Sequence, residues 1–436
     1  MAVPAALHRN LRLRDLVFMG IIMIQPTAPM PLFGVVSNEA RGHVVTTILI
    51  AMVAMLFTAI SYGRMARAYP SAGSAYTYVG QEVHPALGYL AGWGMLMDYV
   101  LNPLICTIWS AKAAMNVVPA VPEQVWKIFF AVLFTWLNVR RIEASARTNL
   151  ILTAVMGIVI LWMLGATVHW LMAHPGTNYL QPFYDPAKFD MKLISSGTAL
   201  AVLTYIGFDG ISTLSEEVED PRRNILLGTV IVCLIIGVLS AIEVYAAQLI
   251  WPHGEAFPDV DTAYVYVAGR AGGVVLFQVI NFTLLIATVG SGAGAQMAGG
   301  RLLYGMGRDG VLPKEFFGAI DEKSRVPRNA VLTIGAISLC GSFLLTYQTG
   351  AELLNFGAFI GFMGVNLAAL LRYFIRAEKK QLTHLIIPAL GFLICGYMWI
   401  NLSSVALRAG AIWAAAGILC GAYYTGGFKK TSMPPE

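Results

Sequence analysis

Apolar runs of about 20 residues, separated by short polar stretches, fill the chain from end to end. A run of this length is what an α-helix needs to cross the hydrocarbon core of a bilayer. We predict twelve such helices, at 15–38, 44–67, 86–115, 124–139, 145–172, 193–217, 224–250, 271–303, 328–347, 351–374, 383–403 and 408–426. The polar segments between them are too short for a soluble domain, so residues 1–436 are expected to form one membrane domain.

Composition supports this interpretation. Of the 436 residues, 57% are hydrophobic and 12% are charged, whereas roughly a quarter of a typical soluble domain is charged. So few charges cannot cover a soluble protein of this size. The first apolar run contains Gln25 and three prolines and lacks a clean small-residue cleavage site, so we interpret it as a working helix and not as a signal peptide.

Lysine and arginine are distributed unevenly between the predicted loops. The loops on the side of the termini hold 22 of them, the opposite loops hold 6, and Lys112 lies inside a helix. The positive-inside rule therefore predicts that both termini are cytoplasmic. The net charge of +5 indicates this orientation and contact with anionic lipid headgroups, and does not indicate nucleic-acid binding.

Two predicted helices carry sequence breaks at mid-depth. In the first, three prolines fall within 26–31, which removes three backbone donors and bends the chain. A single proline would indicate a simple kink, whereas three predict an unwound stretch. In the sixth, Gly207 and Gly210 bracket Phe208 and Asp209. The alternative is that these glycines only permit close helix packing, but an acid at this depth favours a break.

The two breaks occupy corresponding positions, because the first and sixth helices each begin a unit of five helices. Paired interruptions of this kind are the best sequence indication of the central site of an inverted-repeat transporter. Exposed helix N-termini would favour an anionic group such as a carboxylate. Free carbonyl groups would favour an ammonium group.

Ionisable residues fall in the third, sixth and seventh predicted spans, namely Asp98, Lys112, Asp209 and Glu243, and an acid at the bilayer centre costs about 2.5–3.5 kcal/mol. Asp98 either lines a central cavity or proton path, or makes a structural hydrogen bond to a neighbouring helix. Lys112 is fourteen residues further on, about 21 Å along a helix, so it cannot pair with Asp98 and is expected to extend toward the outer interface near Asn116. Asp209 lies in the second break, and Glu243 is a candidate gate residue or proton site.

Other chemistry finds little support in the sequence. No P-loop is present, the seven histidines show no metal-binding spacing, and the five cysteines form no CxxC pair and are expected to be small buried side chains. We predict no cofactor, no metal and no direct coupling to ATP. An enzyme would need a nucleophile and base at one depth, and a channel would need a polar stripe along several helices; neither pattern is found.

Three motifs follow one another in the expected places. The first is YPSAGSAYTY at 69–78, followed by GYLAGW at 88–93 and LMDY at 96–99; the second is YIGFD at 205–209 with LSEE at 214–217 and DPRR at 220–223; the third is RLLYGMGRDGVLP at 301–313. With these motifs the chain, from Leu13 to about Tyr424, resembles the amino acid–polyamine–organocation (APC) permeases, and among them the putrescine-importer branch.

The resemblance implies a LeuT-type fold and transport by alternating access. The two inverted five-helix repeats would be 13–172 and 193–374, with peripheral helices 11 and 12 at 383–426, and the segment 69–78 would help to close the inner gate. The residues that it implies for substrate binding are Gln25, Pro26, Thr27, Ala28, Pro29, Asp98, Tyr99, Tyr205, Ile206, Phe208, Asp209 and Ser291. The candidates for ion coupling are Asp98, Asp209 and Glu243.

The sequence departs from the family pattern in two places. Many members have a Gly-Ser-Gly-like break in the first helix, whereas prolines here leave fewer amides to hold a carboxylate, which favours amines. Some proton-coupled members carry a lysine in the fifth helix, and 149–164 has none, so the coupling group stays open. Asp98 and Asp209 suit the two ammonium groups of a diamine, but acids at these positions also suit carriers of neutral amino acids.

We therefore expect a secondary transporter in a bacterial inner (plasma) membrane. Its substrate would be an amino acid or a polyamine such as putrescine, imported with H⁺ as the preferred coupling ion. The alternative is a sodium-coupled or exchange carrier of neutral amino acids. Membrane lipid is the expected surrounding, and the chain is expected to be a monomer or a homodimer.

Overall fold

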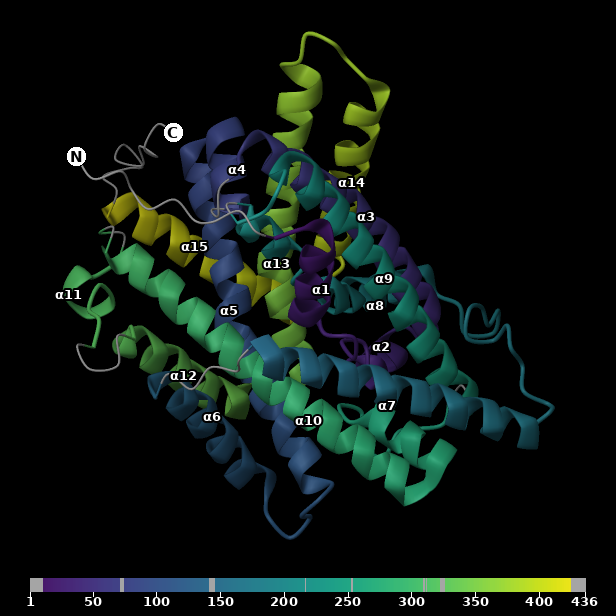
Figure 1. Cartoon of the computed structure of the whole chain (residues 1–436). Coiled ribbons are helices and arrows are strands. Elements are labelled where there is room, and N and C mark those ends of the chain that lie inside the picture. Colours follow the sequence, from purple (N-terminus) through teal and green to yellow (C-terminus); the bar gives the residue numbers. More distant parts are fainter. Residues whose placement is uncertain are drawn as a thin grey trace.

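The structure is a computed structural model that describes residues 11–70, 74–140, 146–215, 217–251, 254–308, 310, 312–321 and 326–424. Figure 1 shows a bundle of helices, and the described ranges contain no β-strand. The helices are α1 (Leu13–Ile24), α2 (Phe33–Glu39), α3 (Val44–Ala68), α4 (Ser74–Glu82), α5 (Pro85–Met115), α6 (Glu123–Val139), α7 (Ala146–Ala173), α8 (Met191–Ala201), η1 (Val202–Tyr205), η2 (Asp209–Leu214), α9 (Pro221–Ile250), α10 (Ala263–Arg308), α11 (Lys314–Phe317), α12 (Arg328–Leu344), α13 (Tyr347–Leu370), η3 (Leu371–Ile375), α14 (Leu382–Ile400) and α15 (Ser404–Tyr424).

Helices long and apolar enough to cross a bilayer account for half of the chain. Within the described ranges there are eight of them: α3, α7, the helical stretch Met191–Leu214, α9, α10, α13 with η3, α14 and α15. The other predicted spans correspond to the interrupted α1–α2 pair, to the longer but more polar α5, and to α6 and α12, each of 17 residues. The chain is thus a multi-pass membrane protein, and the full set of twelve spans stays a prediction.

Both predicted helix breaks are confirmed. α1 ends at Ile24 and α2 begins at Phe33, with consecutive turns between them. α8 ends at Ala201 and gives way to two short 3₁₀ helices separated by residues 206–208. In both places the ladder of i→i−4 hydrogen bonds stops, as prolines and glycines require.

The structure adds helices that the apolar runs did not predict. α4 lies between α3 and α5, and α10 begins at Ala263, before the predicted start of the eighth helix at 271. That prediction was wrong at its start, because the first part of α10 belongs to a segment interpreted as polar loop. A kink at Gly272 and Gly273, where Gly273 has a φ of 69°, separates this part from the rest of α10. Short or amphipathic helices do not produce a long apolar run.

Close approaches between backbones hold the bundle together. A Cβ added to Gly94 on α5 would lie 2.9 Å from the carbonyl oxygen of Gly357 on α13, and one added to Gly63 on α3 would lie 2.5 Å from Cα of Leu226 on α9. Small residues let helices pack at this distance in a membrane. α5 and α13 therefore form one tightly joined pair and α3 and α9 another.

Polar contacts mark the two ends of the bundle. On the terminal side, Leu11 donates its amide N–H to the carbonyl oxygen of Glu217, just before α9, at 3.0 Å. On the opposite side, beyond the far end of α9, Trp109 donates its indole N–H to the carbonyl oxygen of Asp261 at 2.6 Å. Since α9 has 30 residues, the two ends lie about 45 Å apart along its axis.

The cysteines follow the prediction only in part. All five are free thiols, and Cys106, Cys233 and Cys395 are buried. Cys420 is half-buried and Cys340 is exposed, so the expectation of a buried side chain was wrong for Cys340. An apolar helix in a membrane has an outward face that packs against lipid, so apolar surroundings in the sequence do not imply burial in protein.

Candidate functional site

The two helix breaks lie against each other. Gly207, in the break between η1 and η2, has a φ of +118°, and a Cβ added there would lie 3.2 Å from Cγ1 of Ile24 and 3.5 Å from the backbone of Met23. A Cβ added to Gly210 would lie 3.3 Å from Sδ of Met23. The end of α1 thus rests on the break of the sixth predicted helix.

The first break is enclosed by α7 and α10. Gln25 has a φ of 72°, unusual for a residue with a side chain, and donates its side-chain amide to the carbonyl oxygen of Ala287 on α10 at 3.2 Å. Thr27 is 1% exposed and donates its hydroxyl to Sδ of Met156 on α7 at 3.8 Å. The remaining predicted site residues of this stretch are buried or half-buried: Pro26, Ala28 and Pro29.

Asp209 is held by the backbone of its own break. Its carboxylate accepts a hydrogen bond of 3.2 Å from the amide of Gly207 and also interacts with the amides of Asp209 and Gly210. The side chain is nearly enclosed, with 6% of its residue surface exposed. Ile206, at the start of the break, is half-buried. Interrupting the helix therefore supplies the N–H groups that compensate the buried acid.

Asp98, on α5, lies close enough to Asp209 for the two carboxyl groups to interact electrostatically. It is 8% exposed, and burial and the Asp209 carboxyl group are the influences on its own carboxyl group, with no hydrogen bond from the described residues among them. Tyr99 interacts electrostatically with both acids. The structural hydrogen bond that was the alternative role for Asp98 is not seen in this part of the chain.

Two predicted site residues pack against neighbouring helices. Phe208 is fully buried, and its ring centroid lies 5.5 Å from that of Tyr62 on α3 and 5.5 Å from that of Phe362 on α13. Tyr205 is also fully buried and donates its hydroxyl to the carbonyl oxygen of Ile48 at 2.8 Å. In this conformation both side chains fix the second break to α3 and α13.

Ser291 connects α10 to α5. It donates its hydroxyl to Oδ1 of Asn102 at 3.4 Å, and the thiol of Cys106 donates to the same oxygen at 3.3 Å. Sequence reasoning missed Asn102, although an amide one helical turn after an intramembrane acid is a visible signal. Nearby, a Cβ added to Gly299 would lie 3.1 Å from Cβ of Tyr99, so α10 lies directly over this part of α5.

Glu243 lies inside α9 with 0% of its surface exposed. Within the described ranges neither carboxyl oxygen has a hydrogen-bond partner. Its backbone does make a contact, since Tyr264 donates its hydroxyl to the Glu243 carbonyl oxygen at 3.4 Å. Burying a carboxyl group without a partner is costly, so Glu243 is a candidate functional residue.

On the terminal side, α4 closes over the second break. The hydroxyls of Ser74 and Ser212 are 3.0 Å apart, which joins α4 to η2. The ring of Tyr78 contacts that of Tyr62, with centroids 6.2 Å apart. The first motif thus continues into a helix that touches the sixth predicted span; its residues 71–73 lie outside the described ranges.

Glu82, at the end of α4, is buried and ties this helix to the end of α13. Its carboxylate accepts hydrogen bonds from the hydroxyl of Tyr69 at 2.7 Å and from the guanidinium of Arg376 at 2.8 Å. Arg372, in the single π-helical turn η3, donates to the same carboxylate. A buried acid with three donors fixes the position of α4.

Lys112, on the opposite side, pairs with a loop. Its ammonium group lies 2.7 Å from Oδ2 of Asp261 and 3.1 Å from Oδ2 of Asp259. Lys112 thus extends toward the expected side, and the ion pairs that it makes there, with the loop after α9, were not predicted. Burial raises the pKa of Asp261, and the Lys112 ammonium opposes that rise.

Metal-ligating side chains do not gather in the part of the chain that the structure describes, where no three His, Cys, Asp or Glu residues could hold one ion. The groups near the two breaks are carboxyl groups, tyrosine side chains and freed backbone groups. Such a set can bind positively charged groups and hydrogen-bond donors.

Comparisons with known proteins identify the family. Residues 18–424 match the amino acid permease family. The chain is 34% identical to the low-affinity putrescine importer PlaP of Escherichia coli, over 97% of this chain and 95% of that protein. It is 27% identical to the branched-chain amino acid permease BcaP of Lactococcus lactis, over 94% of each chain. It is 26% identical to the methylthioribose transporter of Bacillus subtilis, over 95% of this chain and 93% of that protein.

The family match covers nearly all of the described helices, from within α1 to the end of α15. It includes both breaks and the three motifs at 69–78, 205–209 and 301–313. The chain belongs to the amino acid permease family, within the APC superfamily that its motifs indicated.

Proposed function

We propose that this protein is a secondary active transporter that imports a polyamine such as putrescine, or an amino acid, by alternating access. The observation that carries the proposal is the enclosure of Asp98 and Asp209 together beside two interrupted helices. Membership of the amino acid permease family and the similarity to a putrescine importer support it. No enzymatic reaction is part of the proposal.

The two acids favour an amine as the group that is bound. Asp209 is already held by backbone amides, whereas no hydrogen bond from the described residues acts on the carboxyl group of Asp98. A carboxylate in this position can take an ammonium group, and carbonyl groups freed in the first break can accept its hydrogen bonds. Since Pro26 and Pro29 donate no N–H there, a substrate carboxylate finds less to bind.

Coupling to protons is the second part of the proposal. Asp98, Asp209 and Glu243 are the candidate groups, and Glu243 would carry its proton in this conformation because a buried charge without a partner is far costlier than a neutral acid. The alternative is sodium-coupled or exchange transport of neutral amino acids. The similarity to a branched-chain amino acid permease is the observation that supports this alternative.

We infer the membrane arrangement from loop charge and family. Twelve spans would form two inverted five-helix repeats with two peripheral helices, and the terminal side would face the cytoplasm of a bacterium whose inner membrane holds the protein. The 22 lysines and arginines in loops on that side support this orientation. α4 and its Glu82 contacts would then form part of the inner gate.

Thermal unfolding of the purified protein tests the substrate. A ligand that binds only the folded state raises its stability, by about 2.7 kcal/mol at 100 times the Kd. We expect diamines to raise the Tm of the wild type and to have little effect on Asp98→Asn. A branched-chain amino acid that stabilises the protein while putrescine does not would favour the alternative.

Uptake into proteoliposomes tests the coupling. With a proton gradient as the only driving force, we expect uptake that a protonophore abolishes. Uptake that ignores the protonophore and follows a sodium gradient would reject proton coupling and leave the assignment as a transporter intact.

A further inference from the structure

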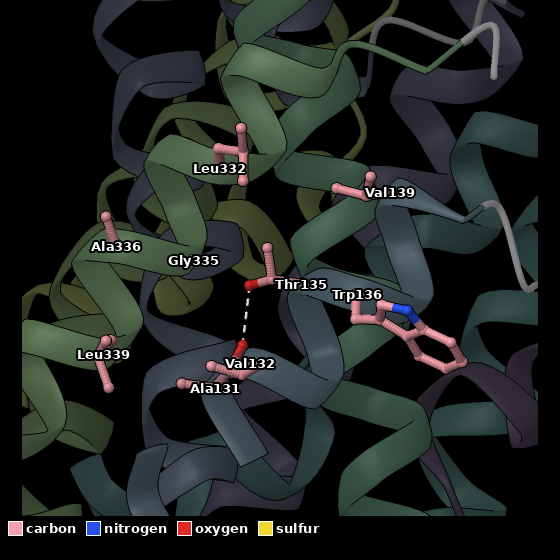
Figure 2. A pocket seen from close by; sticks show the side chains of 9 residues that line it. All are labelled: Ala131, Val132, Thr135, Trp136, Val139, Leu332, Gly335, Ala336 and Leu339. Carbon is pink, nitrogen blue, oxygen red and sulfur yellow. Dashed lines mark hydrogen bonds between the residues drawn. The ribbon is translucent and has the colours of Figure 1, made fainter. Parts of the chain in front are cut away.

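An apolar groove runs between α6 and α12, two helices that contain neither break. Its volume is about 380 Å³, and Figure 2 shows the side chains of the two helices that line it. Its walls are, from α6, Ala131, Val132, Thr135, Trp136 and Val139, and, from α12, Leu332, Gly335, Ala336 and Leu339. Thr135 is the polar member, and its hydroxyl donates to the Ala131 carbonyl oxygen at 2.8 Å.

The groove continues along α6 on the outward face of the bundle. A second apolar hollow of about 290 Å³ shares Val132 and Trp136 with it and extends to Ile128. Val139 to Ile128 is eleven residues of helix, about 16 Å at 1.5 Å per residue. This is close to half of the roughly 30 Å of a hydrocarbon core, so the groove has the length of one lipid leaflet.

Two arginines stand at its terminal-side end, and each continues a row of groove residues. On α6 the row is Val132, Trp136 and Arg140, and on α12, read in the opposite direction, it is Ala336, Leu332 and Arg328. Residues four apart share one helix face. Arg140 and Arg328 are both exposed.

Neither arginine has its charge compensated by the residues that the structure describes. No ion pair or side-chain hydrogen bond of Arg140 or Arg328 occurs there, whereas Arg372 and Arg376 share Glu82. Positive charge at the end of an apolar, lipid-facing groove matches one class of molecule, with an anionic head and long apolar chains.

We propose that this groove binds an anionic phospholipid. An acyl chain would lie between α6 and α12, and the phosphate would be bound by Arg140 and Arg328 at the interface. Trp136, half exposed at 49%, lies near that end, where tryptophan is common in membrane proteins. The site is separate from the transport site and does not depend on which substrate is carried.

The floor of the groove shows how a bound lipid would affect the protein. Gln296 on α10 donates to the Thr135 hydroxyl at 2.9 Å and to the Val331 carbonyl oxygen at 3.1 Å. Asn138 on α6 donates to the Ala293 carbonyl oxygen on α10 at 2.9 Å. The groove therefore lies on the polar contacts that join α6, α10 and α12, and a lipid filling it would stabilise that junction.

Native mass spectrometry of the purified full chain tests the proposal. The probes are phosphatidylglycerol and phosphatidylcholine with the same acyl chains. We expect phosphatidylglycerol to bind more tightly and the preference to fall about fivefold for each arginine replaced in Arg140→Gln and Arg328→Gln, since each charge near the surface is worth about 1 kcal/mol. Lys379→Gln, which removes an exposed charge elsewhere on the same side, is the control.

A second pair of variants tests the groove itself. Ala336→Phe fills it and should weaken the binding of both lipids, whereas Ile337→Phe, on a neighbouring exposed position that does not line the groove, should not. Ala336→Leu replaces the larger change if the lipid-free Tm of Ala336→Phe falls. Equal binding of the two lipids, or binding that survives groove filling, would overturn the proposal. So would a dimer in lipid-free detergent that Ala336→Phe separates, because the occupant would then be a second copy.

Discussion

The amide of Gly207 donates to the carboxylate of Asp209 at 3.2 Å, across the break that Gly207 itself creates. One local feature thus does two things: it stops the helix, and it supplies donors to an acid that would otherwise be buried without compensation. The same glycine lies against Ile24 at the end of α1. The positions of the first break, the second break and Asp209 are therefore linked through one residue.

Gly207→Ala should destabilise the protein. The φ of +118° is unfavourable for any side chain, and the new Cβ would lie 3.2 Å from Ile24, so we expect a loss of about 1–3 kcal/mol. Gly210→Ala is the control, because its Cβ would meet only the flexible Sδ of Met23. Thermal unfolding of the two variants measures the difference. Equal Tm values would mean that Gly207 can relax without cost.

Asp98→Asn and Asp209→Asn should differ in their effects on stability and on amine binding. Asp209 accepts hydrogen bonds from the backbone, so its replacement should cost about 1–2 kcal/mol of stability without ligand. No such bond acts on Asp98 in the described ranges, so Asp98→Asn should leave that stability nearly unchanged and weaken amine binding at least tenfold. Titration of the Tm with putrescine measures both effects. If the Tm measured without ligand falls equally in both variants, Asp98 has a structural role.

Local sequence chemistry predicted the breaks and little of what surrounds them. Prolines at 26, 29 and 31 and the glycine at 207 act on their own backbone, so their effect is visible without a partner. The orientation of Phe208 was not visible in this way. A residue beside a break can face the cavity or the protein, and only the ring contacts with α3 and α13 show that Phe208 faces the protein.

The sequence patterns did not predict contacts between segments that are far apart in the chain. Lys112 lies in an apolar run, and nothing local indicates that the loop carrying Asp259 and Asp261 returns to it. The same holds for Glu82, whose partners Arg372 and Arg376 come from the far end of the chain. Charge pairing within a membrane protein depends on which helices are neighbours, and apolar length does not determine that.

Lys112→Gln should destabilise the opposite side in a pH-dependent way. Burial already raises the pKa of Asp261, so the folded state binds this proton more tightly than the unfolded state does. Stability then falls as the pH rises above the ordinary carboxyl range near 3.9. Without the ammonium group this fall becomes larger. We expect a deficit of about 1–2 kcal/mol near pH 7 that shrinks as the pH is lowered.

The measurement is the Tm of Lys112→Gln and wild type between pH 5 and pH 8. Lys192→Gln, which removes an exposed charge on the same side, should show a small difference that is constant with pH. A deficit for Lys112→Gln that stays constant over this range would show that the two aspartates do not respond to the ammonium group.

Glu82→Gln should loosen α4. The carboxylate accepts from Tyr69, Arg372 and Arg376, and a neutral amide accepts more weakly and at one oxygen only. We expect a cost of about 1–2 kcal/mol and faster amide hydrogen exchange over 74–82. Glu219→Gln, in an exposed pair with Arg12 whose N and O atoms are 3.6 Å apart, should have little effect. If amide hydrogen exchange over 74–82 is unchanged in Glu82→Gln, the position of α4 is fixed by its packing alone.

Two buried glutamates should respond in opposite ways to the same replacement. Glu243 has no partner for either carboxyl oxygen among the described residues, whereas Glu352 accepts from the Gln348 side chain at 3.1 Å and from the Ser403 amide at 3.3 Å. Both are almost fully buried, at 0% and 3% exposure. Removing an uncompensated polar group is stabilising, and removing an acceptor leaves its donors unpaired. Glu243→Met should therefore raise the Tm, and Glu352→Met should lower it, each by the equivalent of about 1–3 kcal/mol.

The stability gained in Glu243→Met is informative only together with transport. If Glu243 takes up and releases the coupling proton, uptake by the stabilised variant should lose its dependence on the proton gradient, while equilibrium exchange of labelled substrate across the proteoliposome membrane persists. A variant that is more stable and still concentrates substrate under a proton gradient would show that Glu243 has no part in coupling. Asp98 and Asp209 would then be left as the acids to test, each by its asparagine variant in the same assay.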